Sequence, residues 1–268
     1  MKRVQKSDIV ALSPYCWEIP RTFKPGMRVP ARIIAEETLL DDIIGDRSLQ
    51  QLVNVTTLPG ILKAAFVMPD VHEGYGFPIG GVAATQYPGG AISPGGIGYD
   101  INCGVRLLLS KMTETEVRPY IPDLIRELYE QIPSGMGAPG RFVLSEEDME
   151  KVLRDGSRWA VEQGKGSKDD LELTESNGCL PGADPEKVSQ RARQRGKDQL
   201  GTIGSGNHFV EVGYVERILE PSLASGYGLQ EGQVTILIHT GSRGLGHQVA
   251  TDYIRLMMEA MARYGIEL

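Results

Sequence analysis

The sequence has few cysteines and histidines and no long apolar run. Its 268 residues include three cysteines and four histidines. An odd number of widely spaced cysteines does not form a disulfide framework, which excludes the disulfide-rich class of small secreted domains. No apolar run reaches the roughly 18 residues of a membrane helix, and no apolar h-region follows the first residues, so we expect no signal peptide. These absences predict a reduced, soluble, cytoplasmic protein with no membrane partner.

An excess of basic charge is also absent. The net charge is −7, whereas nucleic-acid binders are normally basic overall. A local basic groove would still be enough to bind a nucleic acid. What the chain does have is 33 glycines, clustered over residues 74–104 and 201–246. Such clusters predict loops whose backbone closely approaches a ligand or another strand.

Hydrophobic periodicity predicts alternating helices and strands, with no internal repeat and no distinct linker. The expected helices span residues 30–46, 46–53, 113–131, 145–163, 184–200 and 247–263. The expected strands span residues 64–68, 82–86, 105–110, 209–214 and 234–238. The helix over 184–200 is rich in basic side chains, which is typical of a solvated helix surface.

A short glycine-rich segment, residues 95–106, places a carboxylate and a thiol three residues apart. Asp100 and Cys103 form a mixed hard and soft ligand pair that suits a borderline cation such as zinc, manganese or iron. The alternative is a turn-capping Asp beside a small buried thiol. With one Asp and one Cys the metal site is incomplete, and histidines would have to complete it.

Two histidines stand where a strand meets a glycine-rich loop. His208 precedes the strand over 209–214, and His239 ends the strand over 234–238. Each could simply be a histidine hydrogen-bonded to backbone. Loops at strand ends, however, are where rigid scaffolds carry functional groups, and imidazoles complete a sensible set of transition-metal ligands with Asp100 and Cys103. A bridging thiolate could hold two metals on a phosphoryl group, while the spacing matches no zinc finger.

The loop over residues 240–246 opens a helix and resembles an anion cradle. Backbone N–H groups, Ser242 and the Arg243 guanidinium could meet a phosphate there. Phe209 and Glu211 are two residues apart in the predicted strand over 209–214, so their side chains would face the same side. Glu211 could accept hydrogen bonds from a guanine edge, or it could form a cross-strand ion pair.

Four segments together resemble the RtcB family of RNA ligases. They are residues 68–80 (MPDVHEGYGFPIG), 95–106 (GGIGYDINCGVR), 204–211 (GSGNHFVE) and 238–247 (IHTGSRGLGH). The resemblance implies an α+β fold with mixed sheets and a metal site at strand ends. It also implies a GTP- and Mn²⁺-dependent ligase that joins an RNA 2′,3′-cyclic phosphate or 3′-phosphate to a 5′-hydroxyl through a guanylylated histidine.

The resemblance also implies roles for individual residues. The ligands of two manganese ions would be Asp100, Cys103, His208 and His239, with Cys103 bridging. The guanylate site would be lined by Asn207, His208, Phe209 and Glu211, and phosphate would be held by Arg243 and Arg195. Asp70 and Cys103 would act near the reacting RNA ends. The implied partners are RNA, with tRNA halves as the expected substrate, and an archease-type activator.

One departure from the family pattern concerns histidine. The family places a further metal-binding histidine and the guanylylated histidine well downstream, whereas no histidine follows His247 here. We therefore expect residues 1–268 to be the N-terminal portion of a single RtcB-like catalytic domain, truncated at its C-terminal side. Two alternatives remain open: a metal-dependent phosphoesterase, or a non-catalytic metal- or RNA-binding fragment that needs its C-terminal half.

Overall fold

The computed structural model describes residues 3–266, which form two compact units. The first unit comprises the residues up to Gly98 together with those from Tyr253 onward, and the second spans Tyr99–Asp252. Within the described residues, no helix is long and apolar enough to cross a membrane.

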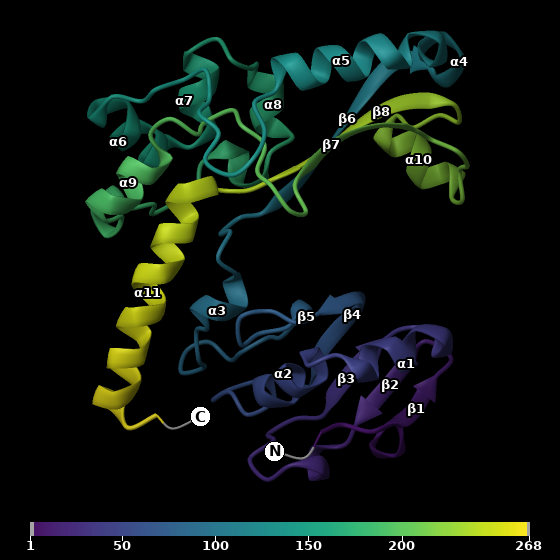
Figure 1. Ribbon diagram of the computed structural model, residues 1–268, viewed down its shortest axis with the longest axis vertical. Helices are drawn as coiled ribbons and strands as arrows, with labels where there is room; N and C mark the ends of the chain where they lie inside the picture. Colours follow the sequence, from purple (N-terminus) through teal and green to yellow (C-terminus); the bar gives the residue numbers. More distant parts are fainter. Residues whose placement is uncertain (1–2, 267–268) are drawn as a thin grey trace. The chain divides into compact units, whose positions relative to one another are not determined.

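A five-stranded mixed sheet organises the first unit (Figure 1). Its strands, in spatial order, are β1 (Val10–Ser13), β2 (Cys16–Ile19), β3 (Ala31–Ile34), β4 (Ala65–His72) and β5 (Ile79–Val82). The pair β3–β4 is parallel and the other pairs are antiparallel. Because a parallel pair needs a crossover connection, helices α1 (Glu37–Gly45) and α2 (Ser48–Val55) lie between these two strands in the chain. The short elements are η1 (Lys6–Asp8), η2 (Arg21–Phe23) and α3 (Pro94–Ile97).

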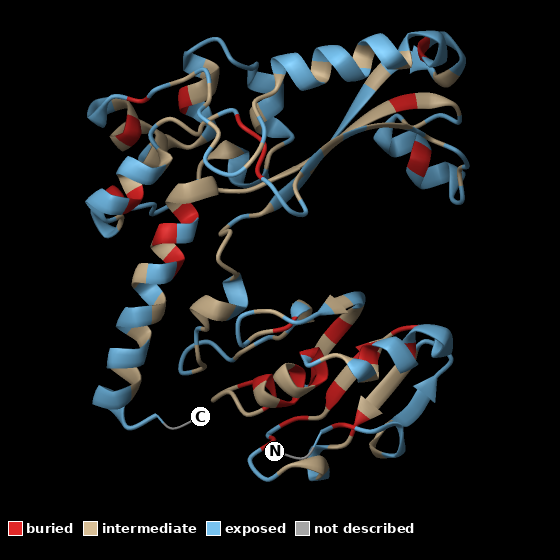
Figure 2. Cartoon of the chain, in the orientation of Figure 1, coloured by how far each residue is buried: buried red, intermediate tan, exposed pale blue. Residues whose placement is uncertain are grey.

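The main hydrophobic core lies between this sheet and its two helices. Ile33 on β3 and Val67 on β4 are fully buried, and Leu49 and Leu52 of α2 belong to the same cluster. Buried residues, red in Figure 2, are dense in this part of the chain.

The prediction of one helix over residues 30–46 was wrong in its first third. Residues Ala31–Ile34 form strand β3, which pairs with β2 on one side and β4 on the other. β-Branched Ile33 and Ile34 fit an extended backbone, and strand pairing on both edges outweighs the local helical pattern. The remaining stripe, with buried Leu40 and Ile43, does form helix α1.

A three-stranded antiparallel sheet organises the second unit. Its spatial order is β6 (Gly104–Thr113), β8 (Gln233–Thr240) and β7 (Phe209–Tyr214), with β8 in the centre. The three predicted strands are confirmed here, although β6 is longer than expected. Together, the mixed five-stranded sheet, this antiparallel sheet and the helices confirm the α+β prediction.

Helices occupy the long connection between β6 and β7. They are α4 (Glu114–Val117), η3 (Arg118–Tyr120), α5 (Ile121–Gln131), α6 (Glu146–Asp155), α7 (Ser157–Glu162), α8 (Lys168–Glu172), η4 (Glu175–Gly178), η5 (Pro185–Lys187) and α9 (Gln190–Gly196). Helix α10 (Pro221–Tyr227) precedes β8, and α11 (Arg243–Tyr264) follows it.

Three of the predicted helices in this connection are divided or shortened. The helix expected over 113–131 is divided into α4 and α5 by the 3-10 helix η3. The helix expected over 145–163 breaks at Gly156, whose φ of +59° is unfavourable for residues with a side chain. Ser145 caps its first half as expected, accepting a hydrogen bond from the Asp148 backbone N–H at 3.0 Å. The helix expected over 184–200 begins only at α9, where Ser189 provides the cap. Local capping chemistry therefore set the boundaries.

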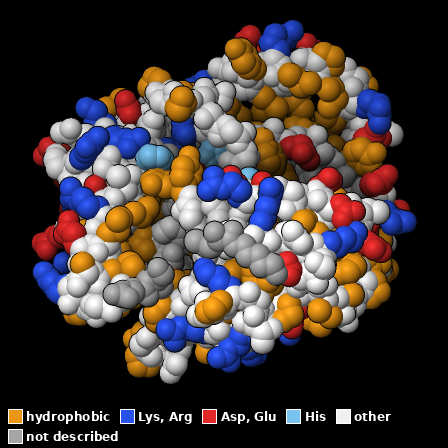
Figure 3. Space-filling view, turned by 60° about the horizontal axis from the view of Figure 1, so that its bottom comes forward, with side chains coloured by type: hydrophobic (Ala, Val, Ile, Leu, Met, Phe, Trp, Pro, Cys, Tyr) orange, Lys and Arg blue, Asp and Glu red, His pale blue; other side chains and the backbone are white. Residues whose placement is uncertain are grey.

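One face of the second sheet is apolar and open. Val105, Leu107 and Leu109 alternate along β6, and their exposed fractions are 62%, 51% and 41%. Hydrophobic side chains, orange in Figure 3, also reach the surface in groups on the side of the molecule shown there. In the register of the sheet Val105 stands opposite His239, so this face also carries the candidate site.

Candidate metal centre

Asp100 and Cys103 lie in a tight turn that leads into β6. The Cys103 backbone N–H donates to the Asp100 carbonyl at 3.1 Å, which closes the turn. Asn102 adopts a left-handed φ of +58° within it, a conformation that Asn tolerates better than most residues. The sequence thus places the carboxylate and the thiol of these two residues side by side.

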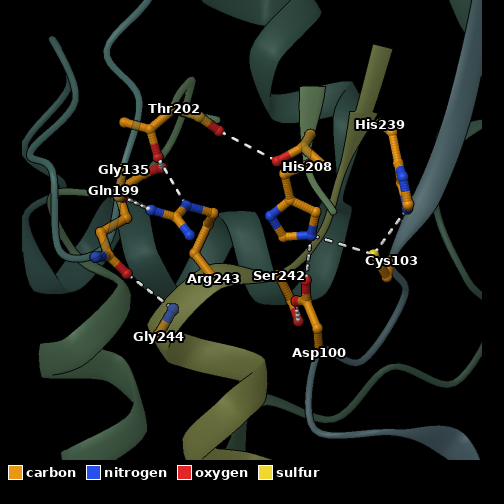
Figure 4. A network of polar contacts seen from close by, with 11 residues as sticks. Asp100, Cys103, Gly135, Gln199, Thr202, His208, His239, Ser242, Arg243 and Gly244 are labelled. Atoms are coloured by element: carbon orange, nitrogen blue, oxygen red, sulfur yellow. Dashed lines mark hydrogen bonds and ion pairs between the residues drawn. The ribbon is translucent and has the colours of Figure 1, made fainter. Parts of the chain in front are cut away.

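Two imidazoles, one from the end of β8 and one from the residue just before β7, meet the Cys103 sulfur (Figure 4). Its Sγ lies 3.2 Å from His208 Nε2 and 3.0 Å from His239 Nε2. Asp100 Oδ2 lies 2.6 Å from His208 Nε2. Ligand atoms of Asp100, Cys103 and His208 all lie within 4.8 Å of one another. The structure therefore brings together the four residues that the sequence singled out.

Strand register explains why these side chains converge. Val105 of β6 and Phe209 of β7 both stand opposite His239 of the central strand β8. Directly opposed residues of an antiparallel sheet project from the same face. Cys103 and His208 immediately precede β6 and β7, so the three segments that carry the candidate ligands meet at one end of the sheet.

The His208 side chain is buried, and only one of its two ring nitrogens has a polar partner among the described residues. Its exposed fraction is 6%, and its Nδ1 has no hydrogen-bond partner among the described residues. Its Nε2 points at the sulfur and the carboxylate. An imidazole aimed in this way at a thiol and a carboxylate fits a metal centre, because the three donors together suit a borderline divalent cation.

The environment of Cys103 disfavours its thiolate. Burial, the negative charge of Asp100 and a hydrogen bond to that residue raise the pKa of Cys103 to about 11. A bound cation reverses this preference, because a coordinating thiol loses its proton.

Two glycines leave space for the side chains of Asp100 and His208, because a Cβ at either position would clash with one of them. An ideal Cβ on Gly241 would lie 2.3 Å from Asp100 Oδ2, and one on Gly204 would lie 1.7 Å from His208 Nδ1. Neither glycine has a left-handed φ. Close approach of side chains, rather than backbone conformation, therefore requires glycine at both positions.

Comparison with known proteins identifies the family. A family model described as "tRNA-splicing ligase RtcB" matches residues 51–268. This chain belongs to the RtcB family. A curated tRNA-splicing ligase RtcB from Thermococcus kodakarensis is 54% identical over 250 residues, which cover 93% of this chain and 52% of that protein.

Other RtcB relatives give the same picture. The tRNA-splicing ligase RtcB of Archaeoglobus fulgidus is 50% identical over 257 residues, covering 96% of this chain and 53% of the relative. The RNA-splicing ligase RtcB of Mycobacterium tuberculosis is 53% identical over 219 residues, covering 81% and 51%. The chain thus spans about half the length of these relatives.

The residues at and just before the start of α11 already have protein partners. Ser242 Oγ donates to Asp100 Oδ1 at 3.3 Å, and the Gly244 backbone N–H donates to Gln199 Oε1 at 2.8 Å. The Arg243 guanidinium donates to Thr202 and Gly135. The loop expected to act as an anion cradle in this RtcB chain thus bonds to its own surroundings, and a phosphate-binding role for Arg243 stays a prediction.

The residues predicted to line a guanylate site lie at the start of β7. Asn207, Phe209 and Glu211 are exposed, and the Phe209 ring meets the His239 ring edge-to-face at a centroid distance of 5.5 Å. Glu211 stands opposite Leu237 and lies two residues after Phe209, on the same face of the sheet.

Arg195 lies on α9 beside the second turn of α11. Its Nη1 donates to Gln248 Oε1 at 3.0 Å and lies 3.5 Å from His247 Nδ1. The His247 ring also packs against Tyr99, at a centroid distance of 5.0 Å. Asp70 is exposed on β4 in the other unit, and its role near reacting RNA ends stays a prediction.

Sequence reasoning missed the residues that support the site. Thr202, Gln199 and Gly135 hold the start of α11 through hydrogen bonds that span 41 to 108 residues of sequence. Thr202 was visible only as part of a glycine-rich string. No local pattern marks such long-range contacts.

Proposed function

We propose that this chain supplies the metal-binding half of an RtcB-type RNA ligase. The enzyme would join RNA 2′,3′-cyclic phosphate or 3′-phosphate ends to 5′-hydroxyl ends, using GTP and a guanylylated histidine. One observation carries the proposal: the Cys103 sulfur lies within hydrogen-bond reach of His208 and His239, with Asp100 beside His208. The names of the curated relatives, tRNA- or RNA-splicing ligases, supply the reaction class.

The carboxylate, thiol and imidazoles of Asp100, Cys103, His208 and His239 suit manganese, and these residues would hold two ions. Asp100 and His208 would complete one set of ligands. His239 lies outside that group of three but reaches the same sulfur at 3.0 Å, so it would belong to a second set. The ions would supply electrostatic stabilisation of phosphoryl oxygens. Ser242 holds the Asp100 carboxylate in place.

The guanine nucleotide would lie against the exposed start of β7. Phe209 offers an apolar ring face, Glu211 offers acceptors for a guanine edge, and Asn207 immediately precedes His208 in the chain. Arg195 would hold phosphate from α9, and Arg243 from the first turn of α11. Asp70 and Cys103 would act at the RNA ends, and Asp70 has an exposed side chain on β4.

The biological setting follows from the same proposal. The substrate would be RNA with the stated ends, with tRNA halves as the expected source, and an archease-type protein would serve as activator. The three cysteines are free thiols, which supports a reducing cytoplasm as the location.

A chimera tests the ligase proposal. This chain is fused to the remaining part of the Thermococcus kodakarensis relative and is given GTP, Mn²⁺ and RNA with 3′-phosphate and 5′-hydroxyl ends. We expect ligation by the chimera and its loss in the Cys103→Ser chimera. Ligation that survives this substitution would refute the role of the cluster. Hydrolysis of the phosphate end without GTP would instead point to a phosphoesterase.

The 268-residue chain by itself gives a second readout. We expect it to bind Mn²⁺, measured by isothermal titration calorimetry, and to lose binding on Cys103→Ser. We expect no stable phosphoramidate adduct with labelled GTP, because its four histidines match other positions of the family pattern. An acid-labile, base-stable label on this chain would contradict that assignment.

A further inference from the structure

Arg243, the first residue of α11, makes an unusual set of contacts. Its Nε donates to Thr202 Oγ1 at 3.0 Å, and its Nη2 donates to the Gly135 carbonyl at 2.7 Å. Its backbone φ is +55°, in the left-handed region that favours glycine. Strained residues of this kind persist where the surroundings fix them, and they cluster at functional sites.

Both partners of Arg243 belong to, or are hydrogen-bonded to, the backbone of residues 202–204. The Gly135 N–H donates to the carbonyls of both Ile203 and Gly204, at 3.1 Å each. Thr202 Oγ1 donates in turn to the Gln199 carbonyl at 2.7 Å. The guanidinium therefore connects α11 to residues 202–204 in two ways. It bonds directly to Thr202, and it bonds to Gly135, which in turn bonds to Ile203 and Gly204.

Gly204 is the part of this backbone that touches the candidate metal centre. An ideal Cβ on Gly204 would lie 1.7 Å from His208 Nδ1 and 2.8 Å from Arg243 Nη1. The imidazole thus rests against the Gly204 backbone, and the guanidinium lies next to both. His208 Nδ1 has no hydrogen-bond partner within the described part of the chain, so no hydrogen bond from its inner nitrogen fixes the ring angle.

We propose that Arg243 is a positioning residue for the metal ligand His208. Metal-bound histidines are normally oriented by a hydrogen bond from their second nitrogen. Here steric contact with Gly204 replaces that bond, and the Arg243 fork holds Gly204 in place. His208 Nε2 consequently points at Cys103 and Asp100. Arg243 need not touch a ligand to do this.

The geometry also explains why arginine serves here and lysine would not. The two acceptors, a side-chain hydroxyl and a backbone carbonyl, are reached by Nε and Nη2 of one planar group. A lysine ammonium is a single point of donation on a flexible stem and lacks this fixed fork.

Conservative changes at Thr202 test the inference without altering Arg243. Thr202 is buried, with an exposed fraction of 4%. Thr202→Val removes the acceptor for Arg243 at nearly constant volume, while Thr202→Ser keeps the hydroxyl. Thr56→Val is the matched control, because Thr56 is also buried and its hydroxyl donates to a carbonyl, that of Val53.

The measurement is Mn²⁺ affinity of the 268-residue chain without nucleotide, by isothermal titration calorimetry, with circular dichroism to verify folding. We expect Thr202→Val and Arg243→Gln each to weaken binding about tenfold, the lower end for lost support of a metal ligand. Thr202→Ser and Thr56→Val should stay near wild type. The thiolate-to-cobalt absorption band of the Co²⁺-loaded chain should shift in Thr202→Val and recover in Thr202→Ser.

The outcomes separate this inference from the proposed function on which it rests. If the wild-type chain binds no metal, the proposed metal centre fails. If it binds metal and Thr202→Val binds equally well with an unchanged cobalt spectrum, the positioning role is refuted. If Arg243→Gln weakens only the binding of GTP to the chimera, Arg243 holds phosphate and does not position His208. Should Arg243→Gln fail to fold, the Thr202 pair still decides.

Discussion

Replacing Gly241 by alanine should displace Asp100, a candidate metal ligand, without unfolding the protein. The new Cβ would lie 2.3 Å from Asp100 Oδ2 and 2.4 Å from both Oδ1 and Cγ. All three atoms belong to the end of one side chain, which can rotate away. Gly241 has no left-handed φ, so alanine introduces no backbone strain. The clash therefore falls on the position of the carboxylate alone.

The size of the effect follows from the required displacement. Ordinary van der Waals contact with a Cβ begins at 3.4 Å, so the Asp100 carboxylate must recede by about 1.1 Å. Metal–ligand distances tolerate only about ±0.2 Å. The carboxylate would leave both His208 Nε2 and the Ser242 hydroxyl. We expect Mn²⁺ affinity to fall about 10- to 100-fold, or roughly 1.4 to 2.7 kcal/mol.

The assay compares Mn²⁺ titrations of wild type, Gly241→Ala and Gly226→Ala. Gly226 lies in α10 of the same unit, has no left-handed φ and has nothing within 4 Å of its ideal Cβ. Alanine in a helix is at least as favourable as glycine, so this control should bind metal like wild type. Thermal melts should show Gly241→Ala within a few degrees of wild type. Wild-type Mn²⁺ affinity in Gly241→Ala would refute the placement of Asp100 in the site.

The break between α6 and α7 and the cap of α4 give two further predictions. Gly156→Ala should lower the free energy of unfolding by about 1–3 kcal/mol, because its Cβ would meet the Gly178 carbonyl at 2.3 Å and φ is +59°. Gly164→Ala, with φ of +70° and no neighbour within 4 Å, should lose less in the same urea titration, and an equal loss would exclude the clash as the cause. Hydrogen bonds from the Thr113 backbone N–H and hydroxyl hold the pKa of Glu116 below its usual value, so the cap stabilises the folded chain above the unfolded pKa and is lost as pH falls through the folded one. Glu116→Gln should therefore show a smaller drop in melting temperature between about pH 7 and about pH 3 than wild type, and an unchanged drop would count against the cap.

Sequence reasoning singled out the residues that converge in the candidate site because each of them carries a local signal. Cys103 and His208 follow glycine-rich strings, and His239 ends an unmistakable apolar strand. Four histidines in 268 residues left few ways to complete a site. Their roles as ligands stay a prediction, whereas their convergence is a property of the fold.

What the sequence could not provide were contacts that depend on distant partners. Residues Ala31–Ile34 were expected to be helical because their pairing with β2 and β4 is invisible locally. The tether from Arg243 to Gly135 spans 108 residues. A local pattern favoured a phosphate role for this arginine, and only the three-dimensional arrangement shows that its fork is already engaged by protein acceptors.

Because β8 is the central strand, the candidate site depends on the correct pairing of β8 with both of its neighbours. Its neighbours β6 and β7 are held in one register, with Val105 and Phe209 both opposite His239. A slip of β8 by a single residue would turn His239 to the opposite face of the sheet. A chain with this shifted register would not bring the His239 imidazole to the Cys103 sulfur. A metal that binds all four residues would therefore stabilise the native strand register over the shifted one.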